Sequence, residues 1–141
     1  PVISSAASDV YKRQGIIWVS SAATGGENGL KIRVYGTKGS IEWLQDDPNN
    51  LKFTELDKPM KVITRASKLV SNFSLSSSRI AAGHPEGFFE AFANIYSEFA
   101  DQIHNKNKKY SFPTIDDGVA GIKFIYAAKK SSNLNSKWIK I

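Results

Sequence analysis

The sequence GHPEGFFEAFANIY, residues 83–96, contains the start of an amphipathic helix. Pro85 suits the first helical position, because the N–H that proline lacks would have no partner there. Apolar residues then recur at spacings of three and four, which is the pattern of one helix face; they are Phe88, Phe92, Ile95, Phe99 and Ile103. We expect this face to pack on a sheet.

The sequence FPTIDDG, residues 112–118, predicts a second helix that starts from Thr114. The threonine hydroxyl can accept a hydrogen bond from the N–H of Asp117, whose carboxylate suits the positive end of the helix dipole. Gly118 and Gly121 each cost about 1 kcal/mol relative to alanine within a helix. We therefore expect another backbone to approach this helix closely at the two glycines.

Short segments rich in β-branched and aromatic residues predict an antiparallel sheet. The segments are residues 15–22, 30–35, 40–44, 51–56 and 60–64, and residues 137–141 are expected to form a last strand. Loops this short join antiparallel neighbours, since a parallel partner needs a crossover of about a dozen residues. The first strand is expected to reverse at Asn28-Gly29, which suits a tight turn. Residues 66–82 are expected to form a long connection with a short helix near residues 67–70.

The composition restricts the class of protein. The chain has 141 residues, enough for one domain with a core. Its net charge of +6 comes mostly from scattered lysines, so binding to nucleic acid is not predicted. No apolar run reaches the roughly 20 residues that span a bilayer, so a membrane role is not predicted. There is no cysteine, which fits a reducing compartment, so the cytoplasm is the expected location. Helix capping explains Asp116-Asp117, so no metal site is predicted.

Residues 1–14 do not match the rest of the chain. Residues 1–8 are small and lack the basic start and long apolar centre of a signal peptide. Residues 9–14, DVYKRQ, look like the translation of an adaptor end used in preparing sequencing libraries. We interpret residues 1–14 as a non-native leader, and we expect the native sequence upstream of residue 15 to be different and longer.

Five blocks of the sequence resemble the C-terminal domain of the sugar and polyol dehydrogenases of the Gfo/Idh/MocA family. They are residues 83–96, residues 112–118, the hairpin series at residues 28–43, the turn at residues 47–49 and the terminal residues 137–141. The likeness runs from about residue 15 to residue 141. It implies an α+β fold of the dihydrodipicolinate-reductase-like kind, with an open, mainly antiparallel sheet and helices packed on one face.

The same resemblance implies a function for the intact protein. Residues 15–141 would bind a sugar, a polyol or a related hydroxyl or carbonyl substrate, and they would support a homo-oligomer through the sheet. NAD or NADP would be held by an N-terminal Rossmann domain, whose glycine-rich turn is absent from this sequence. The family's Glu-Lys-Pro segment, with its catalytic lysine, is absent too. We therefore assign no catalytic or cofactor-binding residue here, and we expect the chain alone to be inactive.

Four residues are candidates for contact with the substrate: His84, Glu86, Asn28 and Arg79. His84 stands just before a helix, where the dipole disfavours the charged imidazolium and leaves a neutral ring able to donate or accept a hydrogen bond. Each candidate also has a purely structural explanation. His84 and Glu86 can stabilise the helix start, Asn28 can form a turn, and Arg79 can be solvated.

A different class of function also fits these residues. The chain could be a non-catalytic module that binds carbohydrate or a partner subunit through its exposed sheet. A glycine-rich strand-to-helix turn in the upstream sequence would favour the dehydrogenase over this module.

Overall fold

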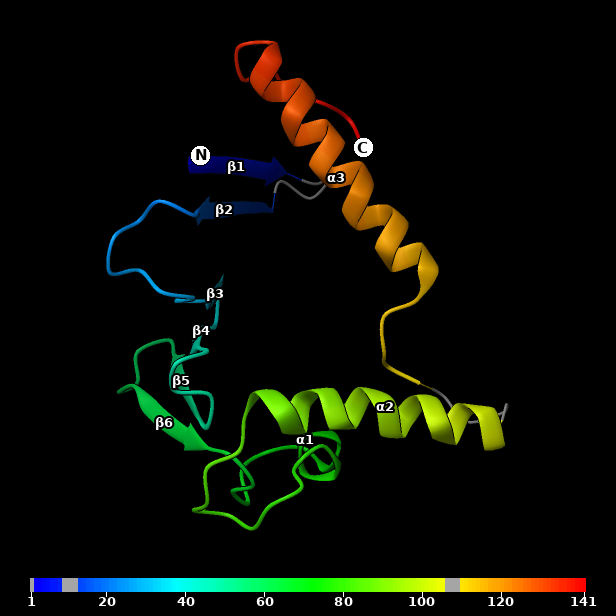
Figure 1. Ribbon diagram of the computed structural model, residues 1–141. Helices are drawn as coiled ribbons and strands as arrows, with labels where there is room; N and C mark the ends of the chain where they lie inside the picture. Colours follow the sequence, from blue (N-terminus) through cyan, green and yellow to red (C-terminus); the bar gives the residue numbers. More distant parts are fainter. Residues whose placement is uncertain (1, 9–12, 106–109) are drawn as a thin grey trace. The chain divides into compact units, whose positions relative to one another are not determined.

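The computed structural model describes residues 2–8, 13–105 and 110–141 (Figure 1). The chain divides into two compact units, which we describe separately. The sheet unit comprises residues 28–111, and the hairpin–helix unit comprises residues 1–27 together with residues 112–141.

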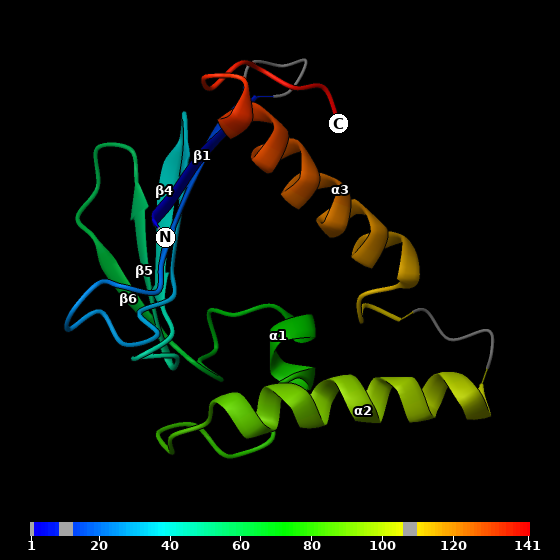
Figure 2. The same ribbon diagram turned by 45° about the horizontal axis from the view of Figure 1, so that its top comes forward.

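The sheet unit contains a four-stranded antiparallel meander in the order β3-β4-β5-β6 (Figure 2). The strands are β3 (Lys31–Gly36), β4 (Gly39–Leu44), β5 (Asn50–Glu55) and β6 (Lys61–Thr64). The four strands expected between residues 30 and 64 are thus confirmed, as is their antiparallel pairing. The α+β class with an antiparallel sheet and helices is confirmed as well.

The two faces of this sheet differ in chemistry. On one face Ile32, Trp43 and Leu51 are cross-strand neighbours, which makes the face apolar. On the other face the Glu42 carboxylate lies 2.9 Å from Lys31 Nζ and 3.0 Å from Lys52 Nζ. Hydrogen bonds from Lys31 and then Lys52 lower the pKa of Glu42 to about 2, so the charge of this carboxylate persists in mild acid. The Glu42 carboxylate on the charged face is therefore paired within the sheet, whereas the apolar side chains of the other face remain partly exposed.

Two helices complete the sheet unit, α1 (Asn72–Ser76) and α2 (Phe88–His104), and they lie side by side in Figures 1 and 2. The short helix is five residues further along than predicted, because the hydroxyl of Ser71 caps it by accepting a hydrogen bond from the N–H of Ser74. Helix α2 is present as predicted, but it begins at Phe88 with Gly87 as its N-cap, three residues after Pro85, which was expected at the first helical position. The Glu90 carboxylate accepts a hydrogen bond from Gly87 N–H at 2.8 Å, which is half of a capping box.

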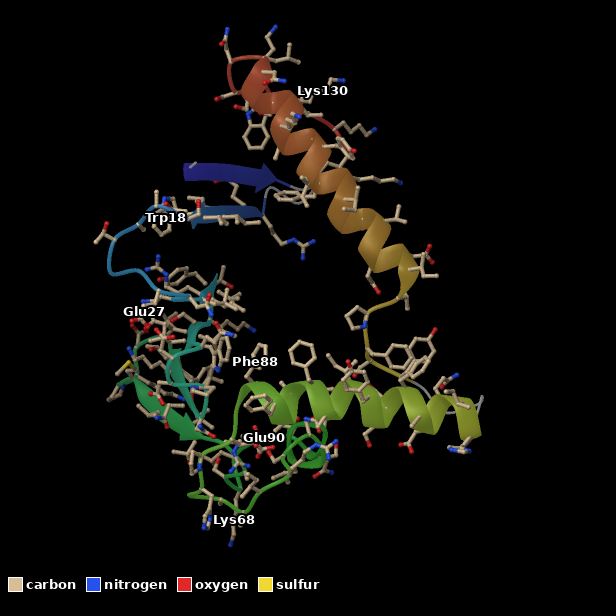
Figure 3. The ribbon with its side chains drawn as sticks, viewed as in Figure 1. Trp18, Glu27, Lys68, Phe88, Glu90 and Lys130 are labelled. Atoms are coloured by element: carbon tan, nitrogen blue, oxygen red, sulfur yellow. The ribbon has the colours of Figure 1, made fainter. Side chains whose placement is uncertain are left out.

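The apolar stripe of α2 is present but remains largely uncovered within its unit. Phe88 and Glu90 project from opposite sides of the first turn (Figure 3). Ile95, the most protected residue of the stripe, is 41% exposed, and Ile103 is 61% exposed. Among the described residues, no apolar side chain is fully buried. The strand residues expected to face a core are also exposed, with Val34 at 53%. The apolar surfaces that the sequence predicts are thus formed but not closed into a core.

The hairpin–helix unit contains the hairpin β1 (Val2–Ser8) and β2 (Gln14–Ser20), and the helix α3 (Ile115–Asn133). The strand predicted at residues 15–22 is confirmed as β2. Its expected partner was wrong, because β2 pairs with β1 in antiparallel register from Val2↔Ser20 to Ser8↔Gln14 and not with the strand after Asn28-Gly29. The interpretation of residues 1–14 as a non-native leader stays a prediction.

The start of α3 is as predicted, but two other expectations for residues 112–141 are not met within this unit. The Thr114 hydroxyl caps Asp117 N–H at 3.4 Å, and the Asp117 carboxylate accepts the Thr114 N–H at 2.7 Å. The pKa of the Asp117 carboxyl is lowered, first by the hydrogen bond from the Thr114 N–H and then by the one from the Thr114 hydroxyl. Within the hairpin–helix unit, no described atom comes within 4 Å of a Cβ built on Gly118 or Gly121, so the expected close backbone approach is not formed in this unit.

The last strand expected at residues 137–141 is also not formed. Asn135 and Ser136 take positive φ values of 54° and 62°, and the Ser131 hydroxyl donates to the Lys137 carbonyl at 2.7 Å. The chain therefore turns back onto the end of α3, and its alternating side chains do not join a sheet. None of the helices in the described ranges is long and apolar enough to cross a membrane.

Candidate functional site

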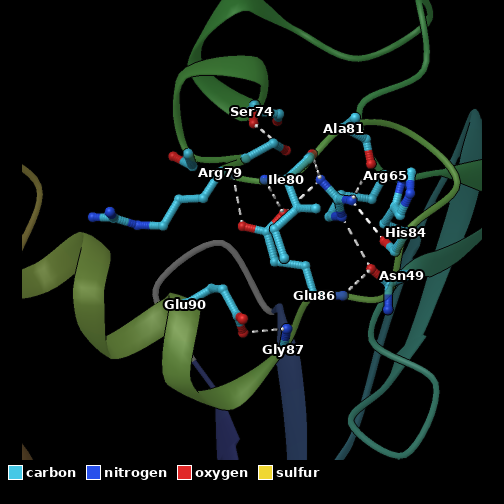
Figure 4. Close-up of polar contacts among 12 residues, drawn as sticks. Asn49, Arg65, Ser74, Arg79, Ile80, Ala81, His84, Glu86, Gly87 and Glu90 are labelled. Atoms are coloured by element: carbon cyan, nitrogen blue, oxygen red, sulfur yellow. Dashed lines mark hydrogen bonds and ion pairs between the residues drawn. The ribbon is translucent and has the colours of Figure 1, made fainter.

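The connection between β6 and α2 is organised around the guanidinium of Arg65 (Figure 4). Its Nη1 donates to the Ile80 carbonyl at 2.8 Å, and its Nη2 donates to the carbonyls of Ala81 at 3.0 Å and His84 at 2.8 Å. Its Nε donates to Asn49 Oδ1 at 3.0 Å. One side chain at the end of the sheet thus holds a loop that lies up to 19 residues further along the chain.

The Glu86 carboxylate is the charge partner of Arg65. Arg65 Nη1 lies 2.5 Å from Glu86 Oε2, and the two side chains are only 15% and 5% exposed. The carboxylate also accepts hydrogen bonds from the N–H groups of Arg79 at 2.8 Å and Ile80 at 3.3 Å. The Glu86 N–H in turn donates to Asn49 Oδ1 at 3.1 Å. We call Asn49, Arg65 and Glu86, with the carbonyls of residues 80, 81 and 84, the Arg65 cluster.

Arg79, a predicted substrate residue, is engaged in a second set of bonds. Its Nε donates to Asn94 Oδ1 and its Nη2 to the Ala93 carbonyl, each at 2.7 Å. The Asn94 amide completes the contact by donating to the Ser77 carbonyl at 2.7 Å. The guanidinium of Arg79 therefore ties the loop to α2.

His84 is the one predicted residue of this loop whose side chain remains available. Its backbone is held, because its carbonyl accepts from Arg65 and its N–H donates to the Ala81 carbonyl at 3.3 Å. Its imidazole is exposed and makes no hydrogen bond or ion pair with residues 2–8, 13–105 or 110–141. The preceding Gly83 has a φ of +83°, a conformation that residues with a side chain rarely adopt. The structure thus presents a free ring on a constrained backbone.

Asn28, the fourth predicted residue, is not brought to this loop by any contact in the described part of the chain. It lies exposed just before β3, between Glu27 and Gly29, which both have positive φ. Its contact with substrate stays a prediction.

Sequence reasoning missed Arg65 and Asn49. Arg65 ends an apolar strand, and Asn49 lies in a turn whose composition already explained it. The only signal was an acidic residue beside a proline at a helix start, which requires a cation if it is buried. Nothing in the sequence indicated which of the 19 lysines and arginines would supply that cation.

The described residues do not fit the diphosphate of a dinucleotide or a metal ion. A helix N-terminus binds phosphate through free N–H groups. At α2 the Glu90 carboxylate occupies the Gly87 N–H, and at α3 the Asp117 carboxylate occupies the Thr114 N–H. No group of three or more potential metal ligands occurs in the part of the chain that the structure describes.

The family model described as "Oxidoreductase family, C-terminal alpha/beta domain" matches residues 10–141. The chain belongs to the Gfo/Idh/MocA oxidoreductase family. This membership accords with the antiparallel sheet and helices described above, and the matched model is that of the family's C-terminal domain. The match begins five residues before the boundary that we predicted for the native sequence.

Individual Gfo/Idh/MocA oxidoreductases are similar over most of this chain. The uncharacterized oxidoreductase YfiI of Bacillus subtilis is 35% identical in an alignment over 133 residues, and the match covers 89% of this chain and 34% of that protein. The crystal structure of an oxidoreductase from Sinorhizobium meliloti shares 49% identity and a TM-score of 0.86, over 90% of this chain and 36% of that one.

A third relative carries ligands. The inositol dehydrogenase homolog from Azotobacter vinelandii, solved in complex with NADH and myo-inositol, shares 30% identity and a TM-score of 0.91. The likeness covers 98% of this chain and 38% of that one. The chain thus spans about a third of the length of these Gfo/Idh/MocA proteins.

Proposed function

We propose that this chain is the substrate-binding domain of an NAD(P)-dependent dehydrogenase. The intact protein would transfer a hydride between the nicotinamide and a sugar, polyol or related hydroxyl or carbonyl compound. The observation that carries this proposal is the likeness, over nearly the whole chain, to an inositol dehydrogenase homolog complexed with NADH and myo-inositol. NAD or NADP would bind to an N-terminal Rossmann domain, and carboxylates already accept the N–H of Gly87 at the start of α2 and of Thr114 at the start of α3.

In this proposal His84 contacts the substrate. A neutral imidazole has one donor and one acceptor nitrogen, so it can either donate a hydrogen bond to a substrate hydroxyl group or accept one from it. The held backbone supports the assignment, because a binding group that is already in place loses little conformational freedom when the substrate arrives. Glu86 and Arg79, in contrast, would serve the site by holding the loop, since their charged groups are already paired within the chain.

Replacing His84 with alanine tests this assignment in the intact oxidoreductase. Because one hydrogen bond to the substrate would be lost, we expect kcat/KM for the polyol substrate to fall about tenfold, mainly through KM. His104→Ala is the matched control, since His104 lies in the last turn of α2 and is exposed. Steady-state kinetics with NAD(P)H absorbance would measure both variants. Equal kcat/KM values for His84→Ala and the control would remove His84 from the site.

We further propose that the intact protein is a homo-oligomer that uses the sheet. Ile32 and Val34 lie on one face of edge strand β3 and are about half exposed, and exposed apolar area of this kind drives association. Analytical ultracentrifugation of the intact protein at micromolar concentration is expected to give a mass at least twice that of one chain. A monomer under these conditions would contradict the proposal.

A further inference from the structure

Arg65 and His84 are connected through the backbone of the loop. Arg65 Nη2 bonds the Ala81 and His84 carbonyls, and the N–H of His84 returns to the same Ala81 carbonyl. The loop of residues 81–84 is therefore a turn closed around one nitrogen of the guanidinium. Figure 4 shows the guanidinium between the Glu86 carboxylate and the backbone of His84.

We propose that Arg65 is a positioning residue that sets the place of the His84 imidazole, an inference that rests on the proposed function only for its catalytic consequence. Arg65 does not reach the substrate site through its own side chain, because its three nitrogens are occupied by Asn49, by three carbonyls and by Glu86. It acts through the backbone that carries the ring.

The chain on both sides of the imidazole is fixed by this cluster. Towards the N-terminus, the Ile80 and Ala81 carbonyls bind the guanidinium. Towards the C-terminus, only Pro85 separates His84 from Glu86, whose N–H binds Asn49 and whose carboxylate pairs with Arg65. Proline fixes its own φ and restricts the backbone of the residue before it. The side-chain torsions of His84 are therefore the main freedom left to the ring.

Arginine is required by the geometry of the acceptors. A guanidinium offers five N–H donors in a rigid planar fork, so it can bind four oxygens and a carboxylate in different directions. A lysine offers three donors at a single point. Arg65→Lys would keep the charge beside Glu86, and with it the fold, while losing most of the carbonyl bonds. A change seen in Arg65→Lys would therefore report the lost positioning of the loop, because the charge that neutralises Glu86 is still present.

The first test measures the ring itself. Intact protein with ¹³Cε1-labelled histidine would be compared by NMR as wild type and as Arg65→Lys, with the His84 signal identified by its absence in His84→Ala. We expect the His84 signal to shift or split in Arg65→Lys and the His104 signal to stay in place. Arg33→Lys is the matched control, because Arg33 lies exposed on β3 outside the Arg65 cluster. An unchanged His84 signal in Arg65→Lys would overturn the inference.

A second variant keeps the test decisive if Arg65→Lys fails to fold. Asn49→Ala removes the oxygen that accepts hydrogen bonds from Arg65 Nε and from the Glu86 N–H, but it leaves the Arg65–Glu86 pair in place. It is expected to move the same His84 signal. If it leaves that signal unchanged, the inference is overturned.

The kinetic test compares Arg65→Lys in two backgrounds. Residues that act through one another show non-additive effects. With His84 present, Arg65→Lys should lower kcat/KM several-fold, by no more than the roughly tenfold cost of His84→Ala. In the His84→Ala background it should change kcat/KM by less than about twofold. The same several-fold loss in both backgrounds would show a merely structural role and overturn the inference. A His84 signal that moves while His84→Ala keeps full activity would overturn the proposed function alone.

Discussion

Arg65→Met is expected to lower the free energy of unfolding by about 3–5 kcal/mol, because it leaves the carboxylate of Glu86 buried without its cation. The two side chains are 15% and 5% exposed, so water cannot replace the guanidinium efficiently. The carbonyls of Ile80, Ala81 and His84 would also lose their donors. The loop before α2 and the start of that helix should therefore loosen first.

Denaturant unfolding of the intact oxidoreductase, with hydrogen exchange to locate the change, would measure this effect. Lys61→Met is the matched control, since it also removes a cation beside a carboxylate, Glu55, but at an exposed site where a second lysine, Lys58, remains. Its effect should be far smaller because solvent screens exposed ion pairs. Equal losses for the two variants would contradict the view that Arg65 neutralises a buried charge. Adding Glu86→Leu should restore only part of the stability, because the carboxylate also binds two N–H groups.

Gly39→Ala is expected to have the next largest effect on stability, a loss of about 1–3 kcal/mol. A Cβ built on Gly39 would lie 2.5 Å from the carbonyl oxygen of Thr54 and 3.4 Å from the Cα of Glu55. Both atoms belong to the backbone of the neighbouring strand β5, so the clash cannot be relieved by a side-chain rotation. The pairing of β4 with β5 would have to shift at its first residue pair, Gly39↔Glu55.

Gly36→Ala is the matched control, because Gly36 is paired with Gly39 across the same hairpin. Its added Cβ would come no closer than 3.4 Å, to the Gly39 carbonyl oxygen, which is at the edge of ordinary contact. Thermal unfolding of the intact protein would compare the two. A Gly39→Ala variant as stable as Gly36→Ala would show that the strands are not held as close as described here.

Local signals predicted much of the fold. The alternation in residues 31–64 predicted the meander, since the side-chain period of a strand is visible without any knowledge of its partner. Thr114 and Asp117 predicted the start of α3, because a helix cap is formed by residues three positions apart. Predictions failed where a distant partner decides the structure. The strand at residues 15–22 pairs with β1 and not with the strand after Asn28-Gly29. Residues 137–141 alternate like a strand, yet they have no strand partner among the described residues.

The candidate site shows the same division. The sequence pointed to the loop at residues 83–87, because a proline and an acidic residue at a helix start are recognisable locally. It did not separate the roles of the four candidates. The structure assigns the charged groups of Glu86 and Arg79 to bonds within the protein, whereas the imidazole of His84 has no hydrogen bond or ion pair among the residues that the structure describes.

By itself, the sequence determined the strands of the meander, the two long helices, the cap of α3 and the likeness to Gfo/Idh/MocA oxidoreductases, because each is written in residues close together in the chain. Only the tertiary structure decided that Arg65 neutralises Glu86 and closes the loop around His84. Glu86 is 21 positions and His84 is 19 positions from Arg65 in the sequence. The pairing of a buried charge depends on which side chains folding brings together, and spacing along the chain does not specify that.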